Sequence, residues 1–454
     1  MPFISKNPFT LKVEAEYQEI SSSELDNKLA LAAQAFTAWS ALSYKERAEH
    51  LNELAAYLRS HKEDLGFIIT KEMGKPLAAA NSEVEKSAWV LEYYAEAGED
   101  LLNKEVIKTD AGSSYVVFEP LGVILGVMPW NFPFWQVFRF VAPTLMAGNT
   151  VVVKHASNVP QSAELIAKVF KDSGCPENIY QNLLIGSTRV AEVIKDDRIQ
   201  GVSLTGSEAA GQSVAAIAGQ AIKKSVLELG GSDPFIVLQE ADVDLSCQVA
   251  VTARLNNAGQ TCISAKRFIV EEPVYDQFVS QLLKHYQNLI VGDPENKETN
   301  VGPLATEQIL LEVEKQVDLS VKLGAKILCG GRRLAKTGYF YQPTILTDVK
   351  PGMPAYEEEV FGPVAAVIKV KNSAEAITIA NDTRFGLGAS LWTKDEKLIQ
   401  ELVPQIKAGS VFVNSMVKSD PRLPFGGIKK SGYGREMGAY GIKAFTNIKT
   451  VWIK

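Results

Sequence analysis

Residues 201–231, GVSLTGSEAAGQSVAAIAGQAIKKSVLELGG, decide the fold class of this 454-residue chain. The run GVSLTGS (201–207) is typical of a buried strand, a helical pattern follows through Gln220, and KSVLEL (224–229) predicts a second strand. Two strands joined by a helix make a βαβ unit, in which the strands lie parallel in one sheet. The stretch therefore predicts an α/β fold.

The same alternation continues on both sides of this stretch. Residues 21–103 predict long helices, the first of them opened by a capping box from Ser21 to Glu24. Two series of further strands are expected: SSYVVFEP (113–120), GVILGVMPW (122–130), TVVVK (150–154) and IYQNLLIG (179–186), and then PFIVL (234–238), RFIVEE (267–272), AKILCGG (325–331), AAVIKV (365–370) and SVFVN (410–414). We therefore expect two α/β units that meet near Gly230 and Gly231.

The composition limits the class of protein. Hydrophobic residues make up 46% and charged residues 22% of the chain, which excludes a disordered, collagenous or disulfide-stapled protein. The net charge of −6 predicts neither nucleic acid nor an anionic membrane as a partner. The four cysteines and four histidines lack metal-ligand spacing, so no metal is expected. With no signal peptide or spanning segment visible, we expect a cytoplasmic location.

Cys262, in NNAGQTCISAKR (256–267), is a candidate nucleophile. Small and amide-bearing residues before it suit a tight turn that exposes a thiol to backbone amides. Such a setting is expected to lower the pKa of the thiol and to favour the reactive thiolate. The alternative is a buried cysteine that packs as a small hydrophobic residue.

Two further residues are candidates for acid–base and oxyanion chemistry. Glu228 ends an apolar strand in LELGGSDP (227–234), where partial burial raises the pKa of a carboxylate toward that of a general base. The alternative is an ordinary solvated glutamate. In PWNFP (129–133), two prolines hold Asn131 between aromatic rings, so its NH₂ group could stabilise an oxyanion. Alternatively, Asn131 caps the helix that follows.

Nucleotide binding is predicted where strands end. Lys154 ends the TVVVK strand, at the sheet edge where open α/β sheets bind ligands, and suits a phosphate or ribose contact. Gly186 and the run LTGS (204–207) also follow strands and could present helix N-termini to a pyrophosphate. No G-x-G-x-x-G run follows a strand, so the usual dinucleotide fingerprint is absent.

Taken together, these strings resemble the aldehyde dehydrogenase superfamily, and most of all its succinate-semialdehyde dehydrogenases. The matching strings occur in the family's order over nearly the whole chain: PWNFP, Lys154, LTGS, LELGG, GQTC (259–262), EEVFGP (358–363) and PFGGIKKSGYGRE (424–436). The resemblance implies two Rossmann-like parallel-sheet domains plus a small β bridging domain. It assigns residues 1–102 and 121–229 to the cofactor-binding domain, 230–440 to the catalytic domain, and 103–120 and 441–454 to bridging strands of a homodimer or dimer of dimers.

The resemblance also implies a mechanism of aldehyde oxidation. Cys262 would attack the aldehyde carbon to form a thiohemiacetal, and Asn131 would stabilise its oxyanion. Hydride transfer to the nicotinamide would leave a thioester, which water activated by Glu228 would hydrolyse to a carboxylic acid.

The cofactor contacts implied by the resemblance lie on both domains: Trp130, Lys154, Ser157, Gly186, Thr205, Gly206, Ser207, Glu359 and Phe361. One position departs from many NAD-using members. Ser157 stands where they carry a glutamate that grips the ribose hydroxyls. A glutamate would repel a 2′-phosphate, whereas Ser157 and Lys154 can bind one. We therefore expect both NAD and NADP to be accepted, with NADP preferred.

Two residues imply a substrate that carries a second carboxylate. Arg139, eight residues beyond Asn131, and Ser419 match the carboxylate contacts of succinate-semialdehyde dehydrogenases. Alternatively, Arg139 forms a surface or interdomain ion pair. The rival functions are an NAD-preferring dehydrogenase for uncharged aldehydes, a coenzyme A-acylating dehydrogenase, and a cofactor-binding relative without activity.

Overall fold

The first half of the chain is built around a six-stranded sheet. The computed structural model describes residues 2–454, and the sheet has the order β17-β9-β8-β5-β6-β7. All neighbours are parallel except β17, which pairs antiparallel with β9. The strands are β5 (Val123–Val127), β6 (Thr150–Lys154), β7 (Tyr180–Asn182), β8 (Ile199–Thr205), β9 (Lys224–Glu228) and β17 (Gly432–Tyr433).

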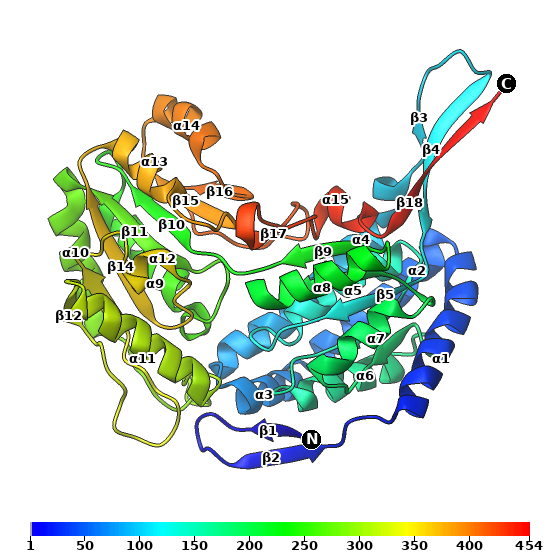
Figure 1. Ribbon diagram of the computed structural model, residues 1–454, viewed down its shortest axis with the longest axis horizontal. Helices are drawn as coiled ribbons and strands as arrows, with labels where there is room; N and C mark the ends of the chain where they lie inside the picture. Colours follow the sequence, from blue (N-terminus) through cyan, green and yellow to red (C-terminus); the bar gives the residue numbers. More distant parts are fainter. Residues whose placement is uncertain (1) are drawn as a thin grey trace.

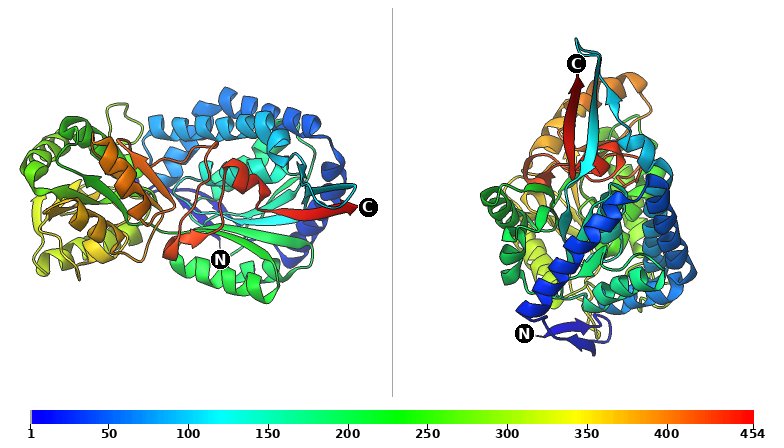
Figure 2. Two further views of the ribbon diagram at one scale, coloured as in Figure 1. Left: turned by 90° about the horizontal axis from the view of Figure 1, so that it is seen from above. Right: turned by 90° about the vertical axis from the view of Figure 1, so that its right-hand side faces the viewer.

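Helices cover both faces of this sheet (Figures 1 and 2). Capping boxes at Ser21 and Ser43 start the first two helices. Gly74, with φ of 78°, ends the third helix, and Pro76 precedes the fourth. The helices are α1 (Ser22–Ala41), α2 (Tyr44–Ser60), α3 (Lys62–Met73), α4 (Leu77–Leu102), α5 (Trp135–Met146), α6 (Pro160–Asp172), α7 (Val190–Lys195) and α8 (Glu208–Gln220).

A seven-stranded sheet organises the second half, in the order β12-β13-β14-β11-β10-β15-β16, with β12 alone antiparallel to its neighbour. Its strands are β10 (Asp233–Val237), β11 (Ala265–Glu271), β12 (Lys326–Cys329), β13 (Thr344–Thr347), β14 (Val364–Val370), β15 (Gly388–Trp392) and β16 (Ser410–Val413). Its helices are α9 (Val243–Leu255), α10 (Glu272–Gln287), α11 (Glu307–Lys322), α12 (Pro354–Glu357), α13 (Ser373–Asn381) and α14 (Glu396–Leu402).

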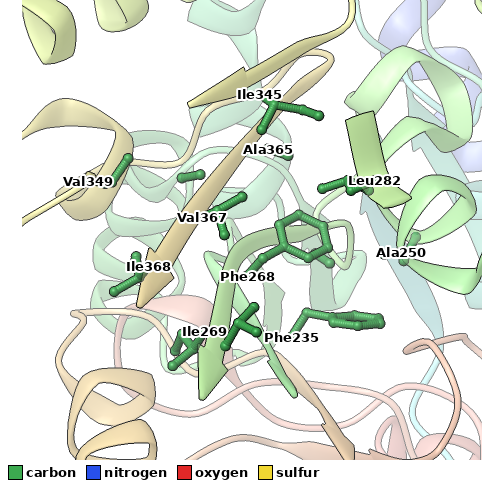
Figure 3. Packing of buried hydrophobic residues seen from close by; sticks show 14 of the residues in the cluster. Phe235, Ala250, Phe268, Ile269, Leu282, Ile345, Val349, Ala365, Val367 and Ile368 are labelled. Carbon is green, nitrogen blue, oxygen red and sulfur yellow. The ribbon is translucent and has the colours of Figure 1, made fainter. Parts of the chain in front are cut away.

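The core of this second unit is made of buried aliphatic side chains with a few aromatic rings among them. The ring centroids of Phe235 on β10 and Phe268 on β11 are 5.2 Å apart, and Leu282 of α10 is buried in the same core (Figure 3). Both strands are buried on both faces, which explains the apolar run FIV in each of them.

A three-stranded antiparallel sheet projects from the body of the molecule (Figures 1 and 2). Here β18 (Thr446–Ile453), after the short helix α15 (Gly438–Lys443), pairs along its whole length with β4 (Ser113–Pro120), which also pairs with β3 (Glu105–Val106). Large apolar side chains on it are exposed, including Ile448 at 60% and Trp452 at 50%.

The predicted α/β class, with parallel strands in two sheets and a small third sheet, is confirmed. The hairpin of β1 (Phe3–Lys6) and β2 (Val13–Tyr17) was not predicted, nor were β13 and β15. The proposed domain bounds stay a prediction, and β17 complicates them because it lies within 230–440 but joins the first sheet. Within residues 2–454, each helix is either too short or too polar to cross a bilayer.

Candidate active site

A cavity of about 310 Å³ lies where β8 and β9 of the first sheet end and meet the loop after α9. Its position agrees with the rule that open parallel sheets bind ligands beyond the carboxyl ends of their strands. The predicted site residues that line it are Trp130, Asn131, Thr205, Gly206, Ser207, Cys262, Glu359 and Phe361. A larger and more open groove of about 500 Å³, beside Tyr286 and Cys329, contains none of the predicted site residues.

Cys262 stands on an unusual turn that follows α9. Asn257, Ala258 and Gly259 have successive φ values of 55°, 53° and 78° in the left-handed region, which costs free energy for the two residues that are not glycine. Buried Arg254 stabilises the turn, because its guanidinium donates to the carbonyl oxygens of Gly259 at 2.9 Å and Val360 at 3.1 Å. The predicted tight turn before Cys262 is therefore present.

The predicted low pKa of Cys262 is wrong for this structure. Burial in the cavity wall raises the pKa of the thiol to about 11, and the positive charges of Arg139 and Lys266 oppose this only in part. The local sequence predicts the turn but not the half-buried position of Cys262 in the cavity wall, which depends on the whole fold. Without a ligand, the thiol is protonated at neutral pH.

Glu228 is deeply buried, with 2% of its surface exposed, so the alternative of a solvated glutamate is wrong. Burial, and next the nearby carboxylate of Glu436, raise the pKa of Glu228 well above its usual value, against the opposing charges of Arg139 and Arg435. The predicted upward shift is confirmed. Neither carboxyl oxygen has a hydrogen-bond partner among residues 2–454. The raised pKa makes this carboxylate, once ionised, a stronger base than an exposed glutamate, which suits it to take a proton from water.

Asn131 links the loop before α5 to the turn that carries Cys262. Its Nδ2 donates to the carbonyl oxygen of Gln260 at 3.0 Å, and Asn257 Nδ2 donates to the Asn131 carbonyl at 2.8 Å. Asn131 is buried and lines the cavity. It does not cap α5, so that alternative is wrong.

The cap of α5 comes from Glu83 on α4, a residue that the sequence analysis missed. Its Oε1 accepts hydrogen bonds from the backbone N–H groups of Phe134 at 2.9 Å and Trp135 at 3.1 Å. Its other oxygen forms a buried ion pair with Lys75, whose ammonium lies 3.6 Å from the centre of the Phe132 ring. The sequence offers one weak signal, the Met73-Gly74-Lys75-Pro76 string, in which Gly and Pro indicate a helix break but not the buried ion pair.

Arg139 lies one turn into α5 and is 1% exposed. Its guanidinium forms an ion pair with Glu436, donates to Thr205 Oγ1 at 3.2 Å and lies 4.5 Å from the centre of the Phe425 ring. An ion pair was the alternative expected for this residue, and it is present, although buried. Substrate contact by Arg139 stays a prediction.

Ser419, the other predicted substrate contact, is buried and accepts a hydrogen bond from Lys86 of α4 at 2.8 Å. Lys86 was not predicted as a site residue. Its ammonium lies 4.2 Å from the centre of the Trp135 ring, at the start of α5.

The cofactor candidates of the first unit lie at strand ends and helix starts. Lys154 is buried at the end of β6, and this burial lowers the pKa of its ammonium. No carboxylate among residues 2–454 forms an ion pair with it. Ser157 is exposed three residues further on. Ser207 caps the thirteen-residue helix α8, and its Oγ accepts from the N–H of Ala210 at 3.3 Å. An unpaired cation and a helix N-terminus suit the phosphates of a dinucleotide.

Gly186 does not join this group. It lies outside the cavity, and its N–H already donates to Glu19 Oε1 at 2.8 Å. The helical segments after it are short, with three residues in the 3₁₀ turn Ser187–Arg189 and six in α7. The structure therefore gives Gly186 no free donor for a pyrophosphate.

The second unit contributes Glu359 and Phe361 to the opposite wall. Phe361 lies edge-on to Trp130, with ring centroids 5.8 Å apart. Glu359 pairs with the ammonium of Lys266 at 3.1 Å and accepts from the N–H of Gly231 at 3.1 Å. The cavity is thus lined by side chains from both units.

Comparison with known proteins identifies the family. The model of the aldehyde dehydrogenase family matches residues 2–451. A probable NADP-dependent succinate-semialdehyde dehydrogenase of Synechocystis is 51% identical over 453 residues, and an NADP-dependent succinate-semialdehyde dehydrogenase of Mycobacterium tuberculosis is 49% identical over 456, each alignment covering both chains fully. The solved structure of succinic semialdehyde dehydrogenase from Streptococcus pyogenes in complex with NADP+ has a TM-score of 0.97 at 38% identity, covering 99% of each chain. The chain therefore belongs to the aldehyde dehydrogenase family.

Proposed function

We propose that this enzyme oxidises succinate semialdehyde to succinate with NADP as its preferred cofactor. The observation that carries the proposal is the convergence of Cys262 and Asn131 on one cavity, with Glu228 buried at the end of β9. The names of the relatives support the choice of substrate and cofactor.

Covalent catalysis begins when the Cys262 thiol gives its proton to solvent water and its sulfur forms a bond to the aldehyde carbon. The carbonyl oxygen becomes an oxyanion in the thiohemiacetal, and Asn131 Nδ2 lies in the wall of the same cavity to donate to it. This use of Asn131 competes with its bond to the Gln260 carbonyl, although an NH₂ group carries two donors. The loss of one oxyanion donor typically costs about 3–4 kcal/mol of activation free energy.

A bound nicotinamide cofactor supplies the hydride acceptor for this family of reactions. Once hydride has left the substrate carbon, Cys262 holds the acyl group as a thioester. Ionised Glu228 then takes a proton from water, whose oxygen attacks the thioester carbon. The carboxylic acid leaves and Cys262 recovers its thiol.

The NADP preference rests on Lys154 and Ser157. Lys154 is a buried cation with no carboxylate partner among the described residues, 2–454, so an added phosphate dianion would meet uncompensated positive charge. Ser157 is exposed and neutral, and its hydroxyl can donate to the same phosphate. Arg139 and Ser419 are proposed to bind the distal carboxylate of the substrate.

We also propose that the enzyme is a cytoplasmic homodimer or dimer of dimers. The projecting sheet of β3, β4 and β18 exposes Ile448 and Trp452, which a partner chain would cover. The four cysteines are unpaired in the structure, as in proteins of reducing compartments. We propose that residues 1–102 and 121–229 bind the cofactor and that residues 230–440 form the catalytic domain. Residues 103–120 and 441–454 would bridge the subunits.

The test is a spectrophotometric panel with succinate semialdehyde and butanal, each against NADP and NAD. We expect the highest kcat/KM with succinate semialdehyde and NADP, and no turnover by Cys262→Ala. Equal kcat/KM for the two aldehydes would overturn the proposed substrate. Equal kcat/KM for the two cofactors would overturn the proposed preference.

A further inference from the structure

Near Ser419 lies a half-buried cation, Lys86, that has no ion-pair partner among residues 2–454. Arg139, the expected carboxylate contact, is ion-paired with Glu436 in the buried interior. Asp420 is bound by Arg422 through two hydrogen bonds at 2.9 and 2.7 Å. Lys86 has no carboxylate at ion-pairing distance among residues 2–454, although it donates to Ser419 Oγ.

The position of Lys86 is determined by two helices. It lies on α4, three residues after Glu83, which caps α5, and its ammonium packs against the ring of Trp135. Trp135 and Arg139 are four residues apart on α5 and therefore share one face of that helix. Lys86 thus lies beside the same helix face from which Arg139 projects.

We propose that Lys86 is a specificity-determining residue that provides the positive charge for the distal carboxylate of the substrate. This inference rests on the proposed function and changes the role of Arg139. Ser419 and Arg139 orient the carboxylate as hydrogen-bond donors, while Lys86 supplies the charge that discriminates a carboxylated aldehyde from a neutral one. A lysine ammonium has three N–H donors, so Lys86 can bind a carboxylate while keeping its hydrogen bond to Ser419.

Burial and electrostatics agree with this assignment. Burial, and next the charge of Arg139, lower the pKa of Lys86 to about 8. The other charged groups that face it are Asp420, Glu83 and Lys418. An anion bound beside Lys86 would relieve the repulsion from Arg139, so the site favours a carboxylate over a neutral group.

The first test is the variant Lys86→Met, which keeps the length and packing of the side chain but removes its charge. We expect kcat/KM for succinate semialdehyde to fall about 10- to 100-fold, mainly through KM, and kcat/KM for butanal to change less than about threefold. Lys86→Arg should retain most of the activity on succinate semialdehyde. Lys418→Met, which removes an exposed charge nearby, is the matched control and should leave the ratio of the two substrates unchanged.

The second test is the pH profile of that substrate ratio. The protonated form of Lys86 binds the carboxylate and is lost as pH rises through about 8. The wild-type ratio of kcat/KM for succinate semialdehyde over butanal should therefore fall between pH 7 and 9. In Lys86→Arg the ratio should stay flat, because the guanidinium remains charged. Titration of Cys262 and Glu228 changes kcat/KM for both aldehydes by the same factor, so it cancels in the ratio.

The possible failures are distinguishable. If the wild type shows no preference for succinate semialdehyde, the proposed function is wrong. If the wild type has that preference and Lys86→Met keeps it, with a flat pH profile, the inference about Lys86 is wrong while the function stands. The inference about Lys86 would also be wrong if Lys86→Met lost activity on both aldehydes equally and Lys86→Arg did not restore it.

Discussion

The ammonium of Lys266 lies 2.6 Å from the carbonyl oxygen of Cys262 and 3.1 Å from a carboxylate oxygen of Glu359. It also donates to the Thr261 carbonyl at 2.9 Å. One buried side chain therefore holds the backbone of the nucleophile and, through Glu359, the wall proposed to contact the cofactor. We therefore expect the position of the thiol and the binding of the cofactor to be coupled through this lysine.

Substitution Lys266→Met should lower kcat about 10- to 100-fold, because a charge-assisted hydrogen bond is worth about 1.5–3 kcal/mol. The KM for NADP should rise as well, since Glu359 loses its ion-pair partner. Lys266→Arg should recover part of both losses. Steady-state kinetics with varied NADP checks this, and a change in protein stability without any change in kcat would contradict the coupling.

The buried pair of Glu83 and Lys75 stabilises the loop that carries Asn131. Glu83→Gln should destabilise the folded enzyme by about 3–5 kcal/mol, because it leaves the Lys75 charge buried and uncompensated. Urea unfolding measures this loss. The double variant Glu83→Gln, Lys75→Met should be more stable than Glu83→Gln alone. Equal stability of the single and double variants would show that the charge pair is not the source of the loss.

The sequence predicted the local structure well where one pattern decides it. The capping box at Ser21 and the apolar run of β6 are examples, because each depends on neighbours in the chain. Glu83, Lys86 and Glu436 were missed because their roles depend on contacts with α5 and Ser419 that are distant in sequence. The pKa of Cys262 was mispredicted for the same reason, since burial is a property of the whole fold.

Glu228 predicts an unusual dependence of stability on pH. Its pKa is raised by folding, so between its unfolded value of about 4.5 and the higher folded value the native state binds a proton that the unfolded state does not. The free energy of unfolding should therefore fall as pH rises through that window. Glu228→Gln should reduce this slope. Its gain in the free energy of unfolding over the wild type should therefore be larger at pH 8 than at pH 5. Urea unfolding at several pH values checks this, and an unchanged slope would contradict it.

The same variant separates the two chemical stages. Glu228→Gln should still transfer hydride once and then stop, because no base activates water for the thioester. We expect a rapid burst of about one equivalent of reduced cofactor per active site, followed by a steady rate at least about 100-fold below wild type. Mass spectrometry of the stalled enzyme should find a succinyl group on Cys262. Steady turnover at the wild-type rate would assign the base elsewhere.

Cys262 should react slowly with iodoacetamide in the absence of ligands. With a pKa of about 11, the thiolate is a small fraction at pH 7.5, and the alkylation rate should rise about tenfold per pH unit up to that pKa. Cys262→Ala identifies the signal of this residue by peptide mapping. A rate that levels off below pH 8 would mean that the thiol is activated before any ligand binds.

Ser157→Glu should reverse the cofactor preference. A glutamate at this exposed position would repel the 2′-phosphate of NADP and accept hydrogen bonds from the ribose hydroxyls of NAD. We expect kcat/KM for NADP to fall at least about tenfold and that for NAD to rise. Ser157→Ala is the control: it removes the hydroxyl without adding charge, so it should weaken NADP binding by less than Ser157→Glu does and leave NAD binding unchanged.

Lys154 is buried without a carboxylate partner within residues 2–454, so the glutamate of Ser157→Glu is also expected to pair with it and remove the second phosphate contact. Lys154→Met alone should then weaken NADP binding more than NAD binding, and equal effects on the two cofactors would place the 2′-phosphate away from both residues.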